Sequence, residues 1–259
     1  MRIKAKTKGL AAAGGALLAA GGLTAVLLTA TGTGAGTGTG SDDGPRALSA
    51  PEAQRMALTR FRTYRASPSA VTLRAATPSG ATVVRAVVDH RRHRAVGAYE
   101  AGDARGLLAW DPAGVAVADA PGDRGGDVVR AAREVRERAW VRRAYAGGPL
   151  DVGLRLVLSL ASDRPDNAQL LAQSGPLWLR GERIGGRSYD VFSGPRPRPR
   201  GTGGSPSGRS PLAYWIDADG NLRRLTADLG TGRTVTVDVT AGRVPGRVPE
   251  EPWKGATGR

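Results

Sequence analysis

One stretch near the N-terminus would be apolar on every face if it formed a helix. Residues 10–30 contain no charged side chain and consist of Leu, Ala, Val, Gly and Thr. Crossing the hydrocarbon core of a bilayer takes about 20 such residues. The first eight residues carry four cations and no acid, which favours a cytoplasmic N-terminus. We therefore predict a basic cytoplasmic tail at 1–9, a transmembrane signal anchor at 10–30 and an extracytoplasmic remainder.

A cleavable signal peptide is the alternative for the same stretch. The apolar core of a signal peptide usually has about 7–15 residues, and small residues mark its cleavage site. The stretch here is longer, but Thr33, Gly34 and Ala35 are small enough for a signal peptidase. The length favours a single-pass membrane protein with its N-terminus in the cytoplasm. Cleavage would instead release a secreted protein.

Alternation of apolar and polar positions begins after a Gly- and Thr-rich segment at 31–47, which we predict to be a flexible linker. Ser49 as the N-cap, Pro51 in the first turn and Glu52 at the capping-box position predict a helix start. The helix should continue through Phe61. The strand-like runs that follow are 71–73, 83–89, 94–99, 107–110 and 115–118.

The middle of the chain changes to helical spacing. Apolar residues recur every three or four positions from Val128 to Ala139, which predicts a helix within 127–145. A strongly apolar run follows, and Asp166 or Asn167 can then cap a short helix. Strand-like runs return afterwards at 177–179, 188–193, 212–216, 222–229 and 234–239.

The last of these runs gives the clearest indication of a two-faced sheet. Val235, Val237 and Val239 share one side of the strand, and polar residues share the other. Helix, strands, helices and strands in this order predict an α+β fold. We expect a curved antiparallel β-sheet, a half-barrel, wrapped around a helical layer at 48–241. The Pro-, Gly- and Arg-rich run at 195–210 should be a mobile insert, and 242–259 a disordered tail.

The amino-acid composition limits which bonds, metal sites and partners this chain can have. The chain has no cysteine, which excludes disulfides, cysteine-ligated zinc and acylation at a cysteine. Its net charge is +15, and all but four of its 38 basic residues are arginine. Outside a cell, such a chain faces lipid headgroups and anionic envelope polymers. Nucleic acid is the generic partner of basic chains, but export argues against it.

No motif in the chain indicates catalysis. The sequence has no G-x-S-x-G elbow, no phosphate-binding G-x-x-x-x-G-K-[ST] loop and no H-E-x-x-H pair. His90 and His93 stand in a run of arginines, which we interpret as a solvated hairpin tip rather than a metal site. Asp217 to Gly220 resembles the start of a calcium loop, but a tight turn explains it better. We expect no enzyme activity, no metal and no cofactor.

Two motifs stand in the C-terminal half of the chain. They are G-x-x-I-G-G-R-S-Y-D-V at 181–191 and Y-W-I-D-A-D-G-N-L-R-R-L at 214–225. In these motifs and in the order of elements from Leu48 to Thr240, the chain resembles a family of bacterial envelope proteins. The family comprises the LolA-like lipoprotein carriers, the LppX/LprG-type lipid-binding proteins and the RseB-type sensors of mislocalised lipoprotein. The resemblance implies an open barrel with an apolar cavity under a helical lid, and no catalytic residues.

From this resemblance we expect a membrane-tethered, extracytoplasmic domain that binds a lipid, a lipidated protein or another apolar ligand. The alternative is an envelope sensor, a protein-interaction module of the same fold with a filled core. Aromatic side chains are the candidates for the ligand cavity, and arginines of the basic run are the candidates for contact with an anionic surface. The cavity candidates are Tyr99, Trp110, Trp178, Tyr189, Tyr214 and Trp215, and the surface candidates are Arg91, Arg92 and Arg94.

Overall fold

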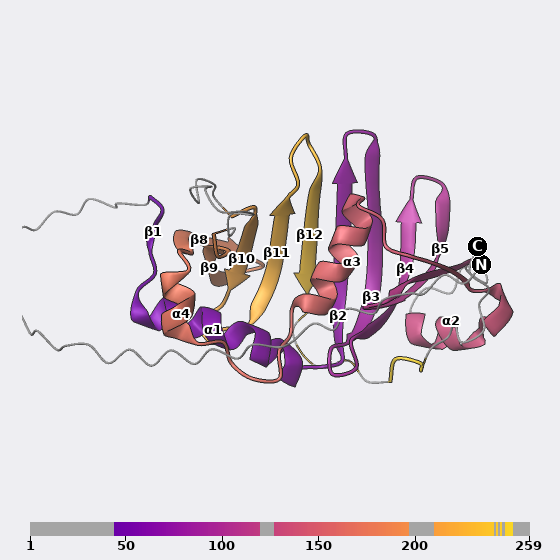
Figure 1. Ribbon diagram of the computed structural model, residues 1–259, viewed down its shortest axis with the longest axis horizontal. Helices are drawn as coiled ribbons and strands as arrows, with labels where there is room; N and C mark the ends of the chain where they lie inside the picture. The colour runs from indigo at the N-terminus through magenta and orange to yellow at the C-terminus, as the bar shows by residue number, and fades with distance from the viewer. Residues whose placement is uncertain are drawn as a thin grey trace, which may run out of the picture. The chain divides into compact units, whose positions relative to one another are not determined.

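A computed structural model describes residues 44–119, 127–196, 210–240, 242, 244 and 247–250. Over these residues the chain has an α+β fold with one large, open, antiparallel sheet and a few helices (Figure 1). None of the helices in this part of the chain has the length and apolar character needed to cross a membrane. The predicted anchor, most of the predicted linker and most of the insert lie outside the described residues.

The sheet consists of two meanders that meet along one pair of strands. Its order is β1-β8-β9-β10-β11-β12-β2-β3-β4-β5-β6-β7, so β12 and β2 join the C-terminal meander to the N-terminal one. The strands are β1 (Arg46–Ala47), β2 (Ser69–Thr77), β3 (Gly80–Asp89), β4 (Arg94–Ala101), β5 (Ala104–Asp111), β6 (Gly114–Asp119), β7 (Val141–Arg143), β8 (Leu177–Ile184), β9 (Arg187–Ser193), β10 (Leu212–Ile216), β11 (Leu222–Asp228) and β12 (Thr234–Val239).

The helices cover both faces of the sheet. α3 (Pro149–Ser159) packs on β12 and β2, and α1 (Ala50–Arg65) packs beside it against β10 and β11 (Figure 1). α4 (Ala168–Gln173) lies against α1. On the opposite face, α2 (Val128–Glu134) covers β3 to β5. The main core therefore lies between the sheet and the layer formed by α1 and α3.

The start of α1 is as the sequence predicts. Ser49 is the N-cap, and its backbone N–H donates to Glu52 Oε2 at 2.8 Å. Glu52 also accepts two hydrogen bonds from Arg46, and this pairing holds the pKa of Glu52 down at about 2 although burial opposes the shift. The helix runs further than Phe61 and ends at Arg65. Arg46 thereby ties the edge of the sheet to the first turn of α1.

The predicted alternation in the last strand is confirmed. Val235, Val237 and Val239 are buried in the main core, whereas Thr234 and Thr236 are more exposed on the other face of β12. Because side chains alternate along a strand, this one pattern sets which face of the sheet α3 covers.

The prediction of one helix over 127–145 is only partly right. α2 ends at Glu134, a short 3₁₀ turn spans Glu137–Ala139, and 141–143 form strand β7 beside β6. Trp140 is almost fully buried in the core on that face. Helical spacing alone could not show that Val141 pairs with Val117, because that contact is long-range.

The folded part also extends beyond its predicted ends. Arg46 and Ala47, which belong to the predicted linker, pair with Trp178 and Leu177 of β8. In the predicted tail, Val248 is 1% exposed and packs in the core beside α2. Strand pairing at one end and apolar burial at the other thus order residues that composition alone assigns to flexible segments.

Candidate functional site: an apolar cavity between helices and sheet

A cavity of about 520 Å³ lies between the helical layer and strands β10 and β11. α1, α3 and α4 form its helical walls, and the C-terminal meander forms its floor. The apolar lining residues are Met56, Leu156, Leu160, Leu170, Leu171, Pro195, Tyr214, Ile216, Leu222 and Leu225. The polar ones are Thr59, Arg60, Ser159, Asp166 and Asn167.

α1 presents one stripe of side chains to the cavity. Met56, Thr59 and Arg60 stand three and four residues apart, and this spacing places them on one side of a helix. The Thr59 hydroxyl donates to the backbone oxygen of Arg55 at 3.1 Å, so its donor is already used. The stripe therefore offers the cavity a largely apolar wall with one cation at its end.

α4 forms a partly exposed wall of the cavity, and its Leu171 packs against the main core. The Asn167 side chain caps it by accepting from the backbone N–H of Leu170 at 3.0 Å. None of the residues of α4 is buried, and Leu170 is 64% exposed. Leu170 and Leu171 both line the cavity. The exposed Leu170 therefore extends the apolar surface of the cavity toward the solvent.

Two charged groups face each other at the rim. Arg60 Nη1 and Asp166 Oδ1 are 3.2 Å apart, and Arg60 Nη2 donates to the backbone oxygen of Ala161 at 3.3 Å. The backbone N–H of Asp166 donates to Ala57 at 3.0 Å. These contacts connect α1 to the segment that leads into α4.

Tyr214 contributes a phenol to the cavity from β10. Burial raises the pKa of Tyr214, and the positive charge of Arg60 opposes that shift. Its hydroxyl therefore stays protonated and can donate a hydrogen bond. Among the described residues it has no hydrogen-bond partner, and it is not sealed from the cavity.

The arrangement is suited to holding an apolar molecule. Its walls are mostly hydrocarbon, and its few polar groups lie together near the rim or at Tyr214. Sites of this kind give affinity by burial and orientation by a few hydrogen bonds. Within the part of the chain that the structure describes, no group of three His, Asp or Glu side chains could hold a metal ion.

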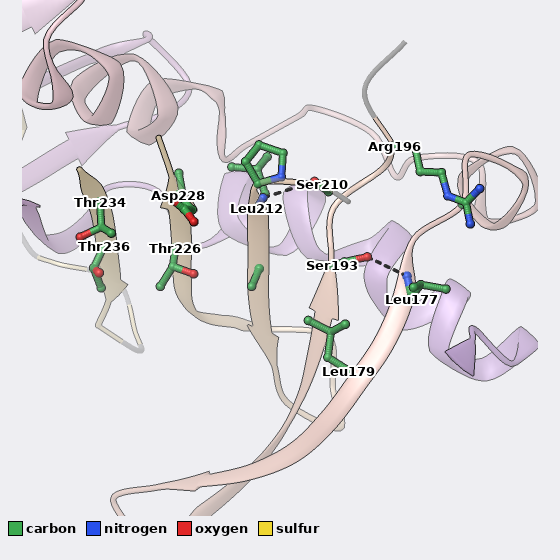
Figure 2. A pocket seen from close by; sticks show the side chains of 14 residues that line it. Leu177, Leu179, Ser193, Arg196, Ser210, Leu212, Thr226, Asp228, Thr234 and Thr236 are labelled. Atoms are coloured by element: carbon green, nitrogen blue, oxygen red, sulfur yellow. Dashed lines mark hydrogen bonds between the residues drawn. The ribbon is translucent and has the colours of Figure 1, made fainter. Parts of the chain in front are cut away.

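A second, larger concavity of about 720 Å³ opens on the other face at the ends of β8 to β12 (Figure 2). It is more polar, with Thr226, Thr234 and Thr236 along two strands. Ser193 and Ser210 use their hydroxyls to accept from backbone N–H groups, as the dashed lines in Figure 2 mark. Its described lining includes Arg196 and Ser210, between which residues 197–209 lie outside the described part of the chain.

Only one of the six aromatic candidates, Tyr214, lines the apolar cavity. Trp110 is fully buried, and its indole Nε1 donates to the backbone oxygen of Leu154 at 3.1 Å, so it joins the sheet to α3. Tyr99 lies across the strand from Gly106, and its ring fills the space that a Cβ at Gly106 would need. Both rings serve packing.

The remaining aromatic candidates are spread over the C-terminal meander. Trp178 lies under the Arg46 guanidinium, 4.5 Å from it to the ring centre, and donates from Nε1 to Asp190 at 2.8 Å. Tyr189 and Trp215 pack together in a small cluster on the other face of the sheet. The sheet thus separates Tyr189 and Trp215 from Tyr214, whereas Trp178 packs against the main core.

The three arginines of the basic run do not form one surface. Arg92 pairs with Asp89 at 3.0 Å. Arg94 is largely buried, with its nearest acid, Glu250, at 3.6 Å. Arg91 is exposed and lies over the Tyr64 ring at 5.5 Å. Arg94 is the first residue of β4, and the alternation of side chains along that strand turns it toward the protein. This explains why Arg94 is largely buried and Arg91 is exposed.

The sequence indicated no site role for the aliphatic lining residues, for Arg60 or for Asp166, which it suggested only as a helix cap. Two features of the sequence could have indicated them. Met56, Thr59 and Arg60 have helical spacing, and two adjacent leucines, Leu170 and Leu171, lie on a very short helix. No protein-family model matches the sequence, and a search of curated proteins finds no match.

Proposed function

We propose that this domain binds an apolar ligand, either a lipid or a lipidated partner, in the cavity between α1, α4 and strands β10 and β11. One observation carries the proposal: a cavity of about 520 Å³ whose lining is mostly aliphatic. Ligand pockets are commonly about 300–1,000 Å³ and are lined in this way, with a few polar groups for orientation.

Burial of hydrocarbon supplies the affinity. Each CH₂ removed from water contributes about 0.8 kcal/mol, so eight of them contribute roughly 6 kcal/mol. That free energy corresponds to a Kd of tens of micromolar, before the cost of ordering the ligand. Tyr214 and the rim pair Arg60–Asp166 would hydrogen bond to the polar end of the ligand.

We infer that the open sheet acts as a half-barrel around the layer of α1 and α3, which is the arrangement that the resemblance to LolA-like carriers implies. We further propose that residues 10–30 anchor the chain in the cell membrane, with this domain on the extracytoplasmic side. The absence of any cysteine argues against an acylated carrier. A tethered domain that samples ligands near its own membrane fits these features best.

We propose that the domain is not an enzyme. Arg60 and Asp166 at the rim are engaged in an ion pair and in backbone hydrogen bonds, and the described lining contains no histidine and no second carboxylate. A sensor with a filled core was the alternative function. The cavity favours ligand binding over that alternative, since a filled core leaves no such volume.

The test is uptake of a fluorescent fatty acid by the full chain held in amphipol. Wild-type protein should increase the probe's fluorescence in a saturable way. Leu156→Trp places an indole in the cavity and should abolish most of the uptake. Val152→Trp, one turn earlier on the same helix and not among the described lining residues, is the matched control and should bind as wild type does.

Thermal unfolding of both variants shows whether the fold survives the added indole. The proposal fails if wild-type protein takes up no probe. It also fails if folded Leu156→Trp takes up as much as wild type, because the probe would then bind elsewhere.

A further inference from the structure

A smaller cavity of about 190 Å³ lies at the C-terminal end of α1, next to the turn between β10 and β11. α1, the starts of β2, β9 and β11 and the end of β12 all contribute to it. Its lining residues are Arg62, Thr63, Ala66, Ser69, Arg187, Tyr189, Asp217, Asn221, Leu222, Arg223, Val239, Thr240 and Gly242.

Three arginines from three different elements line this cavity. The side chains of Arg62 and Arg187 have no hydrogen bond or ion pair with any described residue. Arg223 donates from Nη1 to the backbone oxygen of Val239 at 2.9 Å, which leaves its other N–H groups available. Guanidinium groups on one concavity without acidic partners repel each other, so an anion between them would be stabilised.

One carboxylate, Asp217, is among the described lining residues, and it offsets only part of this positive charge. Asp217 Oδ1 accepts from the backbone N–H groups of Asp219 at 3.0 Å and Asn221 at 2.8 Å. Its Oδ2 accepts from the Asn221 side chain at 3.0 Å. Asp217 is therefore committed to closing the turn. Three guanidinium groups against one carboxylate leave an excess of positive charge in the cavity.

Among the other groups around the cavity, the Tyr189 hydroxyl favours an anion and the last carbonyl groups of α1 oppose one. Tyr189 has a hydroxyl without a hydrogen-bond partner among the described residues. The carbonyl groups at the end of α1 carry partial negative charge and oppose an anion. Two of them are satisfied locally, because Ala66 N–H donates to Arg62 at 2.9 Å and Ser67 N–H to Tyr64 at 3.2 Å.

We propose that this cavity binds an oxyanion, namely a phosphate group. Arginine side chains bind phosphate oxygens through paired N–H donors, and these charge-assisted hydrogen bonds are stronger than neutral ones. Leu222 lines both this cavity and the apolar one, so the two adjoin. The phosphate is either free or the headgroup of a lipid whose chains lie in the apolar cavity. The site does not depend on the proposed function, because free phosphate needs no apolar cavity.

The test measures binding of inorganic phosphate to the full chain in amphipol by isothermal titration calorimetry in chloride buffer. Wild-type protein should show saturable binding at one site. Arg62→Gln and Arg187→Gln should each weaken it about tenfold, the loss expected for one charge-assisted hydrogen bond. Arg65→Gln on the same helix and Arg183→Gln on the same hairpin remove the same charge outside the cavity and should change affinity less than about twofold.

A second arm identifies the source of the phosphate group. The same proteins are titrated with vesicles of phosphatidylcholine, with and without phosphatidic acid. A headgroup site predicts that phosphatidic acid increases binding and that Arg62→Gln and Arg187→Gln abolish this gain. A site for free phosphate predicts no gain, with inorganic phosphate still bound.

Two results overturn the inference. One is the absence of saturable binding of both inorganic phosphate and phosphatidic acid. The other is equal weakening by all four arginine substitutions, which would show that overall charge rather than this cavity attracts the anion. Either result leaves uptake of an uncharged fluorescent lipid by the apolar cavity unaffected.

Discussion

Arg60 of α1 and Asp166, just before α4, form an ion pair of 3.2 Å at the rim of the apolar cavity. Their side chains are 46% and 34% exposed. Because α4 has no buried residue, this pair and the backbone bond from Asp166 to Ala57 are its main polar connections to α1. The relationship makes α4 the most weakly held wall of the cavity.

Arg60→Gln should loosen α4 with little effect on global stability. An exposed ion pair contributes about 0–1 kcal/mol, so the free energy of unfolding should fall by no more than that. Hydrogen exchange followed by mass spectrometry should show faster exchange in peptides covering 166–174. Arg85→Gln breaks an exposed pair with Glu100 on the sheet and should leave α4 unchanged. Unchanged exchange in α4 would show that Leu171 packing, not the ion pair, holds it.

Tyr214→Phe should weaken binding of ligands with a polar end and leave binding of purely apolar ligands unchanged. The substitution removes the one hydroxyl that reaches into the cavity without a hydrogen-bond partner among the described residues. Affinity for a fatty acid should fall about three- to tenfold, as expected for the loss of one hydrogen bond. Affinity for the alkane of the same chain length, which has no polar group, should stay the same. Competition with the fluorescent probe measures both. Equal loss for the two ligands would mean that the ring's packing changed instead.

Arg143→Leu should be the most destabilising change of a single charge. Asp151 is 3% exposed and accepts from Arg143 Nη1 at 2.7 Å and Nη2 at 2.6 Å. Burial tends to raise the pKa of Asp151, and pairing with Arg143 lowers it overall. Losing the partner leaves a buried carboxylate and should cost about 3 kcal/mol of unfolding free energy.

Chemical denaturation checks the Arg143 prediction. Arg142→Leu, the neighbouring arginine on β7, is its control and should cost less than about 1 kcal/mol. Similar losses for the two variants would contradict a special role for the pair with Asp151.

His90 should make the fold sensitive to mild acid. It is fully buried, with Nε2 3.2 Å from Ser69 Oγ and no partner for Nδ1 among the described residues. Burial lowers its pKa to about 4; the charge of Asp89 acts in the opposite direction and His93 adds to the lowering. The neutral form is therefore favoured by folding. Its contribution is complete above the ordinary pKa of about 6.5 and is lost as pH falls toward 4.

The measurement is unfolding free energy against pH between about 7.5 and 4.5. Wild-type protein should lose roughly 2–3 kcal/mol through His90 over that range. His90→Gln should show a flatter profile from a lower starting stability, and the exposed His93→Gln should follow wild type. Parallel profiles for wild type and His90→Gln would contradict the assignment.

The strands were largely predictable from sequence because their information is local. Alternation of Val235, Val237 and Val239 assigns both the strand and its buried face. The strand at 141–143 was not predictable, since its pairing with β6 depends on where Trp140 is buried. The helical spacing of apolar residues that begins in α2 continues into residues 141–143, but tertiary contacts hold those residues in an extended conformation.

The site was less predictable than the fold. Tyr214 and Trp110 are both aromatic residues within apolar strands, and nothing local distinguishes them. One reaches the cavity, and the other fills the space under α3. A cavity is the volume that packed layers leave empty, and it depends on how α1 and α4 meet the sheet. Aromatic content therefore did not indicate the aliphatic lining.

Native mass spectrometry of the full chain, extracted gently from its own membranes, tests the central claim most directly. The account predicts added masses in the range of lipids on wild-type protein, retained in Val152→Trp and absent from Leu156→Trp. A clean unliganded mass for wild type, or the same added masses on folded Leu156→Trp, would contradict a ligand site between α1, α4 and the sheet.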